Sequence, residues 1–412
     1  MAFRLLPLAL LGCEDVRKTP HTHTPPNVVW IVVDTLRADH LGTYGYERKT
    51  SPAIDALARR GAVFESAVAH APWTKPSVAT MLTGLEPRDH GITDWDVPID
   101  PSLDTVQGAF HAAGYATHAV VSHHAFDPRF NNFHVGFDTF DVSALAGATS
   151  PHEIASSEVV SSAAVGAIRD LPEPFFLFLH YFDPHEFYLR HDEFPFGDNA
   201  MDRYDAEIAY TDLAIGQIIA SVDSLGLSGR TYIVLTADHG EEFGDHGGRV
   251  HTLTLYQEAL AVPWIVAGPG IAPDRVAATV GLVHQGPTIL NLAGVPAPIA
   301  MRGRPVPRVN GRFVPFPEPV FSETRRYVDR RSVVDGRYKL IVDRGNGETL
   351  LFDLREDPKE KTNLASNLPE ETRRLSRLIE AHEAGRVVRA PIPLPDELAE
   401  SLNALGYADP TQ

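Results

Sequence analysis

Short apolar runs alternate with helical stretches along the first two thirds of this 412-residue chain. The first run spans residues 27–33 and ends in Asp34, a pattern typical of a buried parallel strand with a polar residue at its carboxyl end. Strands that alternate with helices predict an α/β fold, in which a mostly parallel sheet is sandwiched by helices. Further strands are expected at residues 117–121, 175–181, 231–237 and 262–267, with helices at 51–61, 103–113 and 205–225.

The pattern of expected strands and helices changes near residue 305. Beyond it, short strands are expected at residues 319–323, 332–334, 338–342 and 350–354, followed by a helix at 370–384. Asp-Gly and Asn-Gly pairs join these strands, and such pairs favour hairpins. The sequence therefore predicts a large α/β domain over residues 27–304 and a small antiparallel sheet plus helix within residues 305–412.

Charge excludes a broad nucleic-acid-binding face. The chain carries 36 Lys and Arg residues against 54 Asp and Glu residues, so its net charge is −18. Positive charge for an anionic ligand must therefore come from groups in the binding site itself, and a single metal ion would supply it. After the N-terminus no apolar run is long enough to span a bilayer.

The single cysteine lies in an informative place. Arg4 and a short apolar run lead into Leu-Leu-Gly-Cys at residues 10–13, which is close to a bacterial lipobox. We therefore expect residues 1–12 to be a lipoprotein signal peptide, Cys13 to carry a lipid anchor on the periplasmic side of the envelope, and residues 13–26 to be a tether. An ordinary signal peptide, with secretion, or a misassigned start is the alternative. A disulfide within the chain is excluded.

The segment 72–84 reads Pro-Trp-Thr-Lys-Pro-Ser-Val-Ala-Thr-Met-Leu-Thr-Gly. Pro76 suits the start of a helix, so Thr74 is expected at a helix N-terminus, where free N–H groups favour an anion. The segment resembles the sulfatase signature, in which Cys or Ser, one residue, Pro, one residue and Arg open a helix that ends in Leu-Thr-Gly. The resemblance implies a sulfatase-like, alkaline-phosphatase-superfamily fold with Thr74 as nucleophile, although Val78 stands in the arginine position.

The run Thr-Ala-Asp-His-Gly at residues 236–240 follows the strand expected at 231–237. It resembles the metal motif of the alkaline phosphatase superfamily, which implies one divalent cation held by Asp34, Thr74, Asp238 and His239. Calcium follows from the family resemblance, whereas manganese or zinc follows from the imidazole ligand. Sulfatases usually have a second aspartate where this chain has Thr35. Alternatively, both aspartates only cap the turns after their strands.

Three histidines and one lysine are further candidates for the catalytic site. The resemblance places His185 at a histidine that contacts the ester, His251 at a lysine position, and His124 at the histidine of a Gly-Lys-Trp-His run. Ser122 replaces the lysine of that run. A histidine beside the leaving oxygen acts as a general acid near neutral pH. Lys75 adjoins the nucleophile and is either a substrate contact or a solvated side chain.

These residues imply hydrolysis of a sulfate, phosphate or phosphonate ester through a covalent Thr74 ester. Sulfatases oxidise their Cys or Ser to an aldehyde whose hydrate attacks the ester, a route that Thr lacks. This difference favours a phosphorus ester chemically, whereas the family resemblance favours a sulfate ester. The substrate is expected to be a small-molecule, glycan or lipid anionic ester.

Three other functions stay open from the sequence. A phosphoglycerol- or phosphoethanolamine-type transferase shares the threonine, but such enzymes normally carry several membrane helices. A two-metal phosphodiesterase would use Asp183, His185 and His251 for a second ion. A catalytically inactive, lipid-anchored binding protein would explain the departures at Thr35, Val78 and Ser122, but not the retained metal-ligand set.

Overall fold

The computed structural model describes residues 24–145 and 156–384, with 386, 389–392, 394, 395, 397 and 398 near the C-terminus. The predicted signal peptide, the anchor at Cys13 and most of the predicted tether lie outside these residues, so all three stay predictions. Among the described residues, no helix is both long and apolar enough to cross a membrane.

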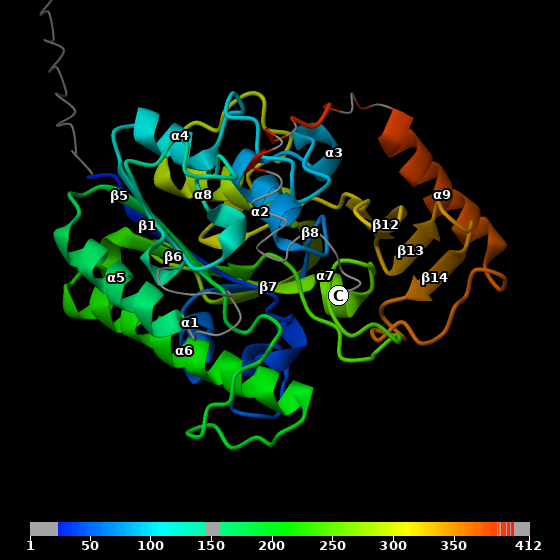
Figure 1. The fold of residues 1–412 in the computed structure, drawn as a ribbon, viewed down its shortest axis with the longest axis horizontal. Helices are drawn as coiled ribbons and strands as arrows, with labels where there is room; N and C mark the ends of the chain where they lie inside the picture. Colours follow the sequence, from blue (N-terminus) through cyan, green and yellow to red (C-terminus); the bar gives the residue numbers. More distant parts are fainter. Residues whose placement is uncertain are drawn as a thin grey trace, which may run out of the picture.

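An eight-stranded sheet forms the centre of the large domain (Figure 1). Its order is β4 (Thr139–Asp141), β3 (Ala116–Val121), β5 (Phe175–Tyr181), β1 (Asn27–Val33), β6 (Thr231–Ala237), β7 (Ala261–Ala267), β2 (Ala62–Val68) and β8 (Asp274–Gly281). Only β7 runs antiparallel to its two neighbours. All seven residues of β1, β5 and β6 are buried, because helices cover both faces of the sheet. The predicted mostly parallel sheet is confirmed.

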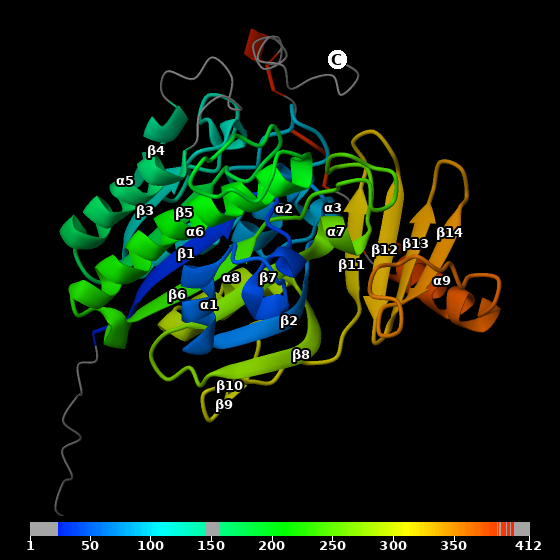
Figure 2. The same ribbon diagram turned by 90° about the horizontal axis from the view of Figure 1, so that it is seen from below.

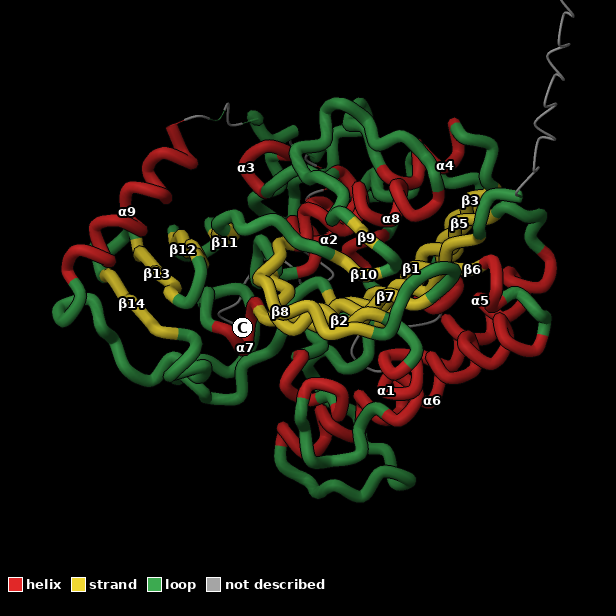
Figure 3. Tube along the Cα trace, turned by 180° about the vertical axis from the view of Figure 1, so that it is seen from behind, coloured by secondary structure: helices red, strands yellow, loops and turns green. Residues whose placement is uncertain are grey.

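Helices lie on both sides of this sheet, as the views from the front and from behind agree (Figures 1 and 3). One face carries α1 (Pro52–Arg59), α5 (Ser157–Asp170) and α6 (Ala200–Ser224); the other carries α2 (Thr74–Thr83), α4 (Val106–Ala112) and α8 (Gln285–Ala293). Shorter elements are α3 (Pro87–His90), α7 (Gln257–Leu260), η1 (Ala38–His40), η2 (Gly42–Tyr44), η3 (His124–Phe126), η4 (Ser143–Leu145), η6 (Ser228–Arg230) and η7 (Leu282–His284).

A second, antiparallel sheet follows in the C-terminal part of the chain (Figure 2). It consists of β11 (Val320–Thr324), β12 (Arg330–Asp335), β13 (Tyr338–Asp343) and β14 (Thr349–Asp353), after a short ribbon of β9 (Arg308–Val309) and β10 (Arg312–Phe313). Helix α9 (Pro369–Ala384) packs on this sheet through a small apolar core of its own, which includes Val333, Leu340 and Leu375. The predicted small sheet plus helix is confirmed.

Several elements were not expected from the sequence. Strand β2 was not expected because exposed Glu65 interrupts its apolar pattern. At this point the pairing register of the strand shifts, between Phe64 and Ala67. Strand β8 was not expected because its buried and exposed residues alternate irregularly. Helix α5 was not expected because many of its residues are small, so that its apolar face is indistinct. Helix α6 begins at Ala200 rather than at residue 205, because the side chain of Asn199 accepts a hydrogen bond from the backbone N–H of Asp202.

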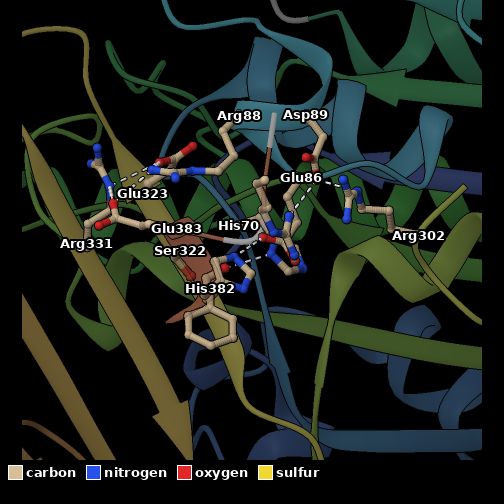
Figure 4. A network of polar contacts seen from close by, with 12 residues as sticks. His70, Glu86, Arg88, Asp89, Arg302, Ser322, Glu323, Arg331, His382 and Glu383 are labelled. Carbon is tan, nitrogen blue, oxygen red and sulfur yellow. Dashed lines mark hydrogen bonds and ion pairs between the residues drawn. The ribbon is translucent and has the colours of Figure 1, made fainter. Parts of the chain in front are cut away.

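A network of charged side chains fastens the C-terminal sheet and α9 to the large domain (Figure 4). From the segment around α3, Glu86 accepts a hydrogen bond from His382 at 2.7 Å, and Arg88 donates to Glu383 at 2.9 Å. Arg331 of β12 also contacts Glu383, at 3.0 Å. Because these groups are largely buried and paired, removal of one partner leaves an uncompensated charge at the junction.

Glu86 is the most strongly perturbed acid of this junction. Burial opposes its ionisation, but the hydrogen bond from His382 and the nearby positive charges outweigh it and lower the pKa of Glu86 to about 2. An acid whose folded-state pKa is depressed stabilises the fold above its unfolded-state pKa. That contribution is lost as the pH falls through the range between the two values, from about 4.3 toward 2.

We expect Glu86→Gln to lower the free energy of unfolding at pH 7 by about 2 kcal/mol, because the ion pairs at the junction lose their acid. The difference in free energy of unfolding between the variant and the wild-type protein should shrink as the pH falls below about 4. Urea unfolding at several pH values measures it. The matched control is Glu380→Gln on the exposed side of α9. Equal stability of the Glu86→Gln and Glu380→Gln variants at pH 7 would contradict this account.

Candidate active site

Two buried carboxylates lie side by side at the carboxyl ends of neighbouring strands. Asp34 follows β1 and Asp238 follows β6, and the last residues of these strands, Val33 and Ala237, are paired in the sheet. Both aspartates are fully buried. Asp238 Oδ1 accepts hydrogen bonds from the backbone N–H groups of Thr35 and His239. Asp34 Oδ1 and Asp238 Oδ2, in contrast, have no hydrogen-bond partner in the described part of the chain.

Thr74 faces this carboxylate pair from the first turn of α2. Its Oγ1 lies 3.5 Å from Asp34 Oδ2 and 3.3 Å from His239 Nε2. One turn along, Ser77 Oγ donates a 2.6 Å hydrogen bond to the carbonyl oxygen of Asp238, which fixes the helix start against the end of β6. The structure thus brings Thr74 to a helix N-terminus, as the sequence predicts.

His239 is held in the form that can ligate a metal. Its Nδ1 donates to the carbonyl oxygen of Gly240 at 2.9 Å, which leaves the lone pair on Nε2. That atom lies 3.4 Å from Asp34 Oδ1 and 3.6 Å from Asp238 Oδ2. Burial lowers the pKa of His239 to about 4, so the ring is neutral at neutral pH.

These donors fit a divalent cation. Asp34, Asp238 and His239 converge with two orphaned carboxylate oxygens and one free imidazole lone pair, and the Thr74 hydroxyl completes the set. Burial raises the pKa of Asp34 well above its usual value, and the negative charges of Asp238 and Glu241 raise it further. A cation would remove this penalty by letting both carboxylates ionise together. The four predicted metal ligands therefore lie together in one buried cluster.

His180 is a site residue that the sequence analysis missed. It lies in β5, is fully buried, and places Nε2 3.9 Å from Asp34 Oδ2 and 3.8 Å from Asp238 Oδ2. Neither ring nitrogen has a hydrogen-bond partner among the described residues. The only signal in the sequence is one histidine in an otherwise apolar strand, one residue before the strand ends.

His123, the residue before the predicted His124, faces the carboxylate pair. Its Nε2 lies 4.0 Å from Asp34 Oδ2, whereas His124 begins the short helix η3. His123 Nδ1 accepts a hydrogen bond from the backbone N–H of Ala125 at 2.8 Å. The proton of the neutral ring is therefore on Nε2, which makes His123 a hydrogen-bond donor toward the site. A role of His124 in catalysis stays a prediction.

His185 and His251 meet at the rim of the same cluster. Their ring centroids are 4.8 Å apart, and His251 lies 4.6 Å from the ring of His239. His251 Nδ1 contacts Glu241 Oε1 at 3.1 Å. Burial opposes a charge on His251, but Glu241 outweighs it, so the pKa of His251 is raised above its usual value. His185 Nδ1 donates to the carbonyl oxygen of Glu186.

Two other predicted residues have structural partners. Lys75 is fully buried, and its Nζ donates to the carbonyl oxygen of Trp95. Burial lowers the pKa of Lys75 to about 7. Asp183, the proposed ligand of a second metal ion, accepts from the backbone N–H groups of Ser156 and Ser157 and so holds the start of α5. That role explains its burial without a second ion.

A second group of donors, Asp34, His123 and His185, also lies close enough to surround an ion. Since the Ala125 N–H occupies Nδ1 of His123, a metal there would need to displace the proton from Nε2. The first group, with its unpartnered carboxylate oxygens, therefore fits a metal better than the second.

Comparisons with known proteins identify the family of this chain. Residues 26–295 match the family model of the sulfatases. The ulvan-active sulfatase of Formosa agariphila is 25% identical over 425 residues, covering 87% of this chain and 81% of that protein. Arylsulfatase K of Xenopus laevis is 30% identical over 190 residues, and this match spans 42% of the chain but only about a third, 35%, of that relative.

Solved structures share the fold. One, in complex with its substrate D-glucosamine-2-N,6-O-disulfate, has a TM-score of 0.75 at 17% identity and covers 87% of this chain and 98% of its own. A putative sulfatase from Bacteroides thetaiotaomicron has a TM-score of 0.74 at 22% identity, covering 89% and 95%. The family model alone spans more than half of the sequence. The chain belongs to the sulfatase family.

Proposed function

We propose that this protein is a metal-dependent ester hydrolase that cleaves a sulfate or phosphate ester with Thr74 as nucleophile. One observation carries the proposal: Thr74 Oγ1 lies at the N-terminus of α2, within 3.5 Å of Asp34 Oδ2 and 3.3 Å of His239 Nε2. A hydroxyl at this place meets both a cluster of cation ligands and a helix end that favours an anion. A binding protein without catalysis has no need of this arrangement.

Asp34, Asp238, His239 and the Thr74 hydroxyl would hold the cation. When bound, such an ion lowers the pKa of a coordinated hydroxyl and offsets charge on a non-bridging ester oxygen. In the protein itself, the Thr74 hydroxyl donates to Asp34 Oδ2, so a lone pair of Oγ1 is directed away from that carboxylate. We propose that Asp34 Oδ2 takes this proton as Oγ1 forms its bond to sulfur or phosphorus.

The histidines would donate to the non-bridging oxygens and to the leaving oxygen of the ester. His123 Nε2–H is placed to donate to a non-bridging oxygen. His251, whose pKa Glu241 raises against the opposing effect of burial, would donate a proton to the leaving alkoxide as the ester bond breaks. In the second step neutral His251 would take a proton from the water that attacks sulfur or phosphorus, while Asp34 returns its proton to Thr74 Oγ1 as the bond from that oxygen breaks.

The substrate is either a sulfate ester or a phosphorus ester. The family model and the sulfatases among the relatives support a sulfate ester. The threonine supports a phosphorus ester, since water must displace Thr74 from sulfur or phosphorus directly. A panel of sulfate, phosphate monoester, phosphodiester and phosphonate esters of one alcohol distinguishes these substrates.

We also propose that the protein is a periplasmic lipoprotein anchored through Cys13. The lipobox-like Leu-Leu-Gly-Cys run supports this proposal. Stable attachment would need more than one acyl chain at that residue.

Thr74→Ala should lower kcat at least about a thousand-fold on the best ester of the panel, because the nucleophile is lost. Thr74→Ser should keep part of the rate, since it retains the hydroxyl and loses only a methyl group. Steady-state kinetics measures both, with Thr80→Ser on the same helix as a matched control. A wild-type rate in Thr74→Ala would refute the proposed nucleophile.

Asp238→Asn should remove most of the bound metal while the fold stays intact, because the strand core does not depend on this side chain. Elemental analysis of the purified protein and circular dichroism measure the two effects. Asp104→Asn, at an exposed position, is the control. Full metal content in Asp238→Asn would show that the ligand assignment is wrong.

His251→Gln should slow alkyl esters far more than 4-nitrophenyl esters, since only a basic leaving group needs a proton from the enzyme. We expect a loss of about a hundred-fold for alkyl esters and less than ten-fold for nitrophenyl esters. Comparison of kcat/KM across leaving groups measures this, with exposed His111→Gln as control. Equal losses on both kinds of ester would exclude His251 as the general acid.

A further inference from the structure

His180 is a buried histidine without a structural partner. Its side chain is fully buried in β5, and neither ring nitrogen has a hydrogen-bond partner among the described residues. A neutral imidazole carries one donor and one acceptor, and an unpaired polar group in the interior costs free energy. A leucine or phenylalanine would continue this apolar strand without that cost. His180 therefore needs a partner that the described part of the chain does not supply.

The register of the sheet places His180 on the same face as both site aspartates. His180 pairs with Val32 of β1, and Val32 pairs with Thr236 of β6. Side chains two positions apart along a strand lie on one face of the sheet. Asp34 and Asp238 come two positions after Val32 and Thr236, so all three site side chains share this face.

The distances within this group are those of ligands that share one cation. Asp238 Oδ2, which has no hydrogen-bond partner in the described part of the chain, lies 3.8 Å from His180 Nε2 and 3.6 Å from His239 Nε2. Asp34 Oδ2 lies 3.9 Å from His180 Nε2. These separations are too long for hydrogen bonds. Donor atoms that each lie about 2.1 Å from one ion are, in contrast, roughly 3 to 4 Å from one another.

The protein holds the His180 ring in this place. The centroid of the ring is 4.5 Å from that of Phe126, at an interplanar angle of 58°. Ser122 Oγ donates to the carbonyl oxygen of His180 at 3.0 Å and accepts from the backbone N–H of Phe182 at 2.8 Å, which fixes the end of β5. Nε2 is therefore presented to the carboxylates by a rigid strand, as a metal ligand requires.

With His180, the cluster offers imidazole nitrogens as well as oxygen atoms. The nitrogens come from His180 and His239, and the oxygens from Asp34, Thr74 and Asp238. Calcium takes about six to eight oxygen ligands, whereas imidazole suits zinc and other first-row transition metals. A donor set with nitrogens from two histidines therefore favours a transition metal over calcium.

We infer that His180 is a further ligand of the cation, beyond the four residues named above, and that this cation is zinc or another first-row transition metal rather than calcium. The inference rests on the proposed function and adds to it the ligand and the class of metal. The other role open to His180 is that of a protonated counter-charge between the two carboxylates. The two roles have opposite effects: loss of a ligand weakens metal binding, whereas loss of a repelling positive charge strengthens it.

Metal titration of the full chain tests the inference without any need for turnover. After a chelator has removed bound metal, calorimetry measures the affinity for Zn²⁺ and Ca²⁺, and visible absorption of the Co²⁺-loaded protein reports the ligand set. The wild-type protein should bind Zn²⁺ at least about a hundred-fold more tightly than Ca²⁺. His180→Ala should weaken Zn²⁺ binding at least about ten-fold and change Ca²⁺ binding less than about two-fold. Its Co²⁺ spectrum should differ from that of the wild type, because one nitrogen ligand is lost.

Two further variants separate a lost ligand from a disturbed strand. His180→Gln keeps most of the side-chain volume and should weaken Zn²⁺ binding as His180→Ala does. His118→Gln in the neighbouring strand β3 is the matched control and should bind Zn²⁺ as the wild type does, because His118 pairs with Leu177, away from the carboxyl end of β5. Circular dichroism shows that each variant is folded.

The outcomes distinguish this inference from the proposed function. Zn²⁺ affinity and a Co²⁺ spectrum unchanged in both His180 variants would overturn the role of His180 as a ligand, and tighter Zn²⁺ binding would identify it as a counter-charge instead. Tighter binding of Ca²⁺ than of Zn²⁺ to the wild type would overturn the class of metal. Each of these results leaves the hydrolase intact. Failure of the wild-type protein to bind any divalent cation would overturn the proposed function, and the inference with it.

Discussion

Two carboxylates without an adequate counter-charge, Asp34 and Asp238, impose the main constraint on this structure. They lie fully buried at the ends of paired strands, where the charged form of an acid is costly. The surrounding groups reduce this cost: backbone N–H groups bind Asp238 Oδ1, and His239 presents an imidazole lone pair. What is still missing is positive charge at the centre, which is the property that a divalent cation brings.

The scaffold keeps the nucleophile within reach of that centre. Helix α2 ends at Gly84, whose φ of 61° is the left-handed conformation that glycine favours at a helix end. At the other end of α2, Ser77 is hydrogen-bonded to the carbonyl oxygen of Asp238. Rigid attachment at this point matters because an attacking oxygen must be placed within a fraction of an ångström.

The sequence predicts the frame of the site better than its rim. Asp34, Thr74, Asp238 and His239 follow strands or open a helix, and such positions are visible as breaks in an apolar pattern. His180 gives a smaller signal, one histidine within a strand whose other residues are apolar, because it neither follows the strand nor opens a helix. His123 and His124 are adjacent, and only the backbone conformation before η3 decides which ring faces the carboxylate pair. Spatial neighbours far apart in the chain, such as Trp73 and Arg326, are likewise beyond a local pattern.

The junction between the two sheets has a consequence for how specificity can change. Arg326 and Tyr327 lie in a loop whose two ends are fixed by the backbone ladder between β11 and β12. Buried ion pairs hold that ladder against α3. The two end residues of the loop take part in them, because Arg325 pairs with Glu323 and Asp329 pairs with Arg331. The three residues 326–328 at the tip take no part in those pairs, so other side chains can be placed over Trp95 at these positions without moving Thr74 or the carboxylates. A catalytic centre of this kind can acquire new substrates by replacing one hairpin tip.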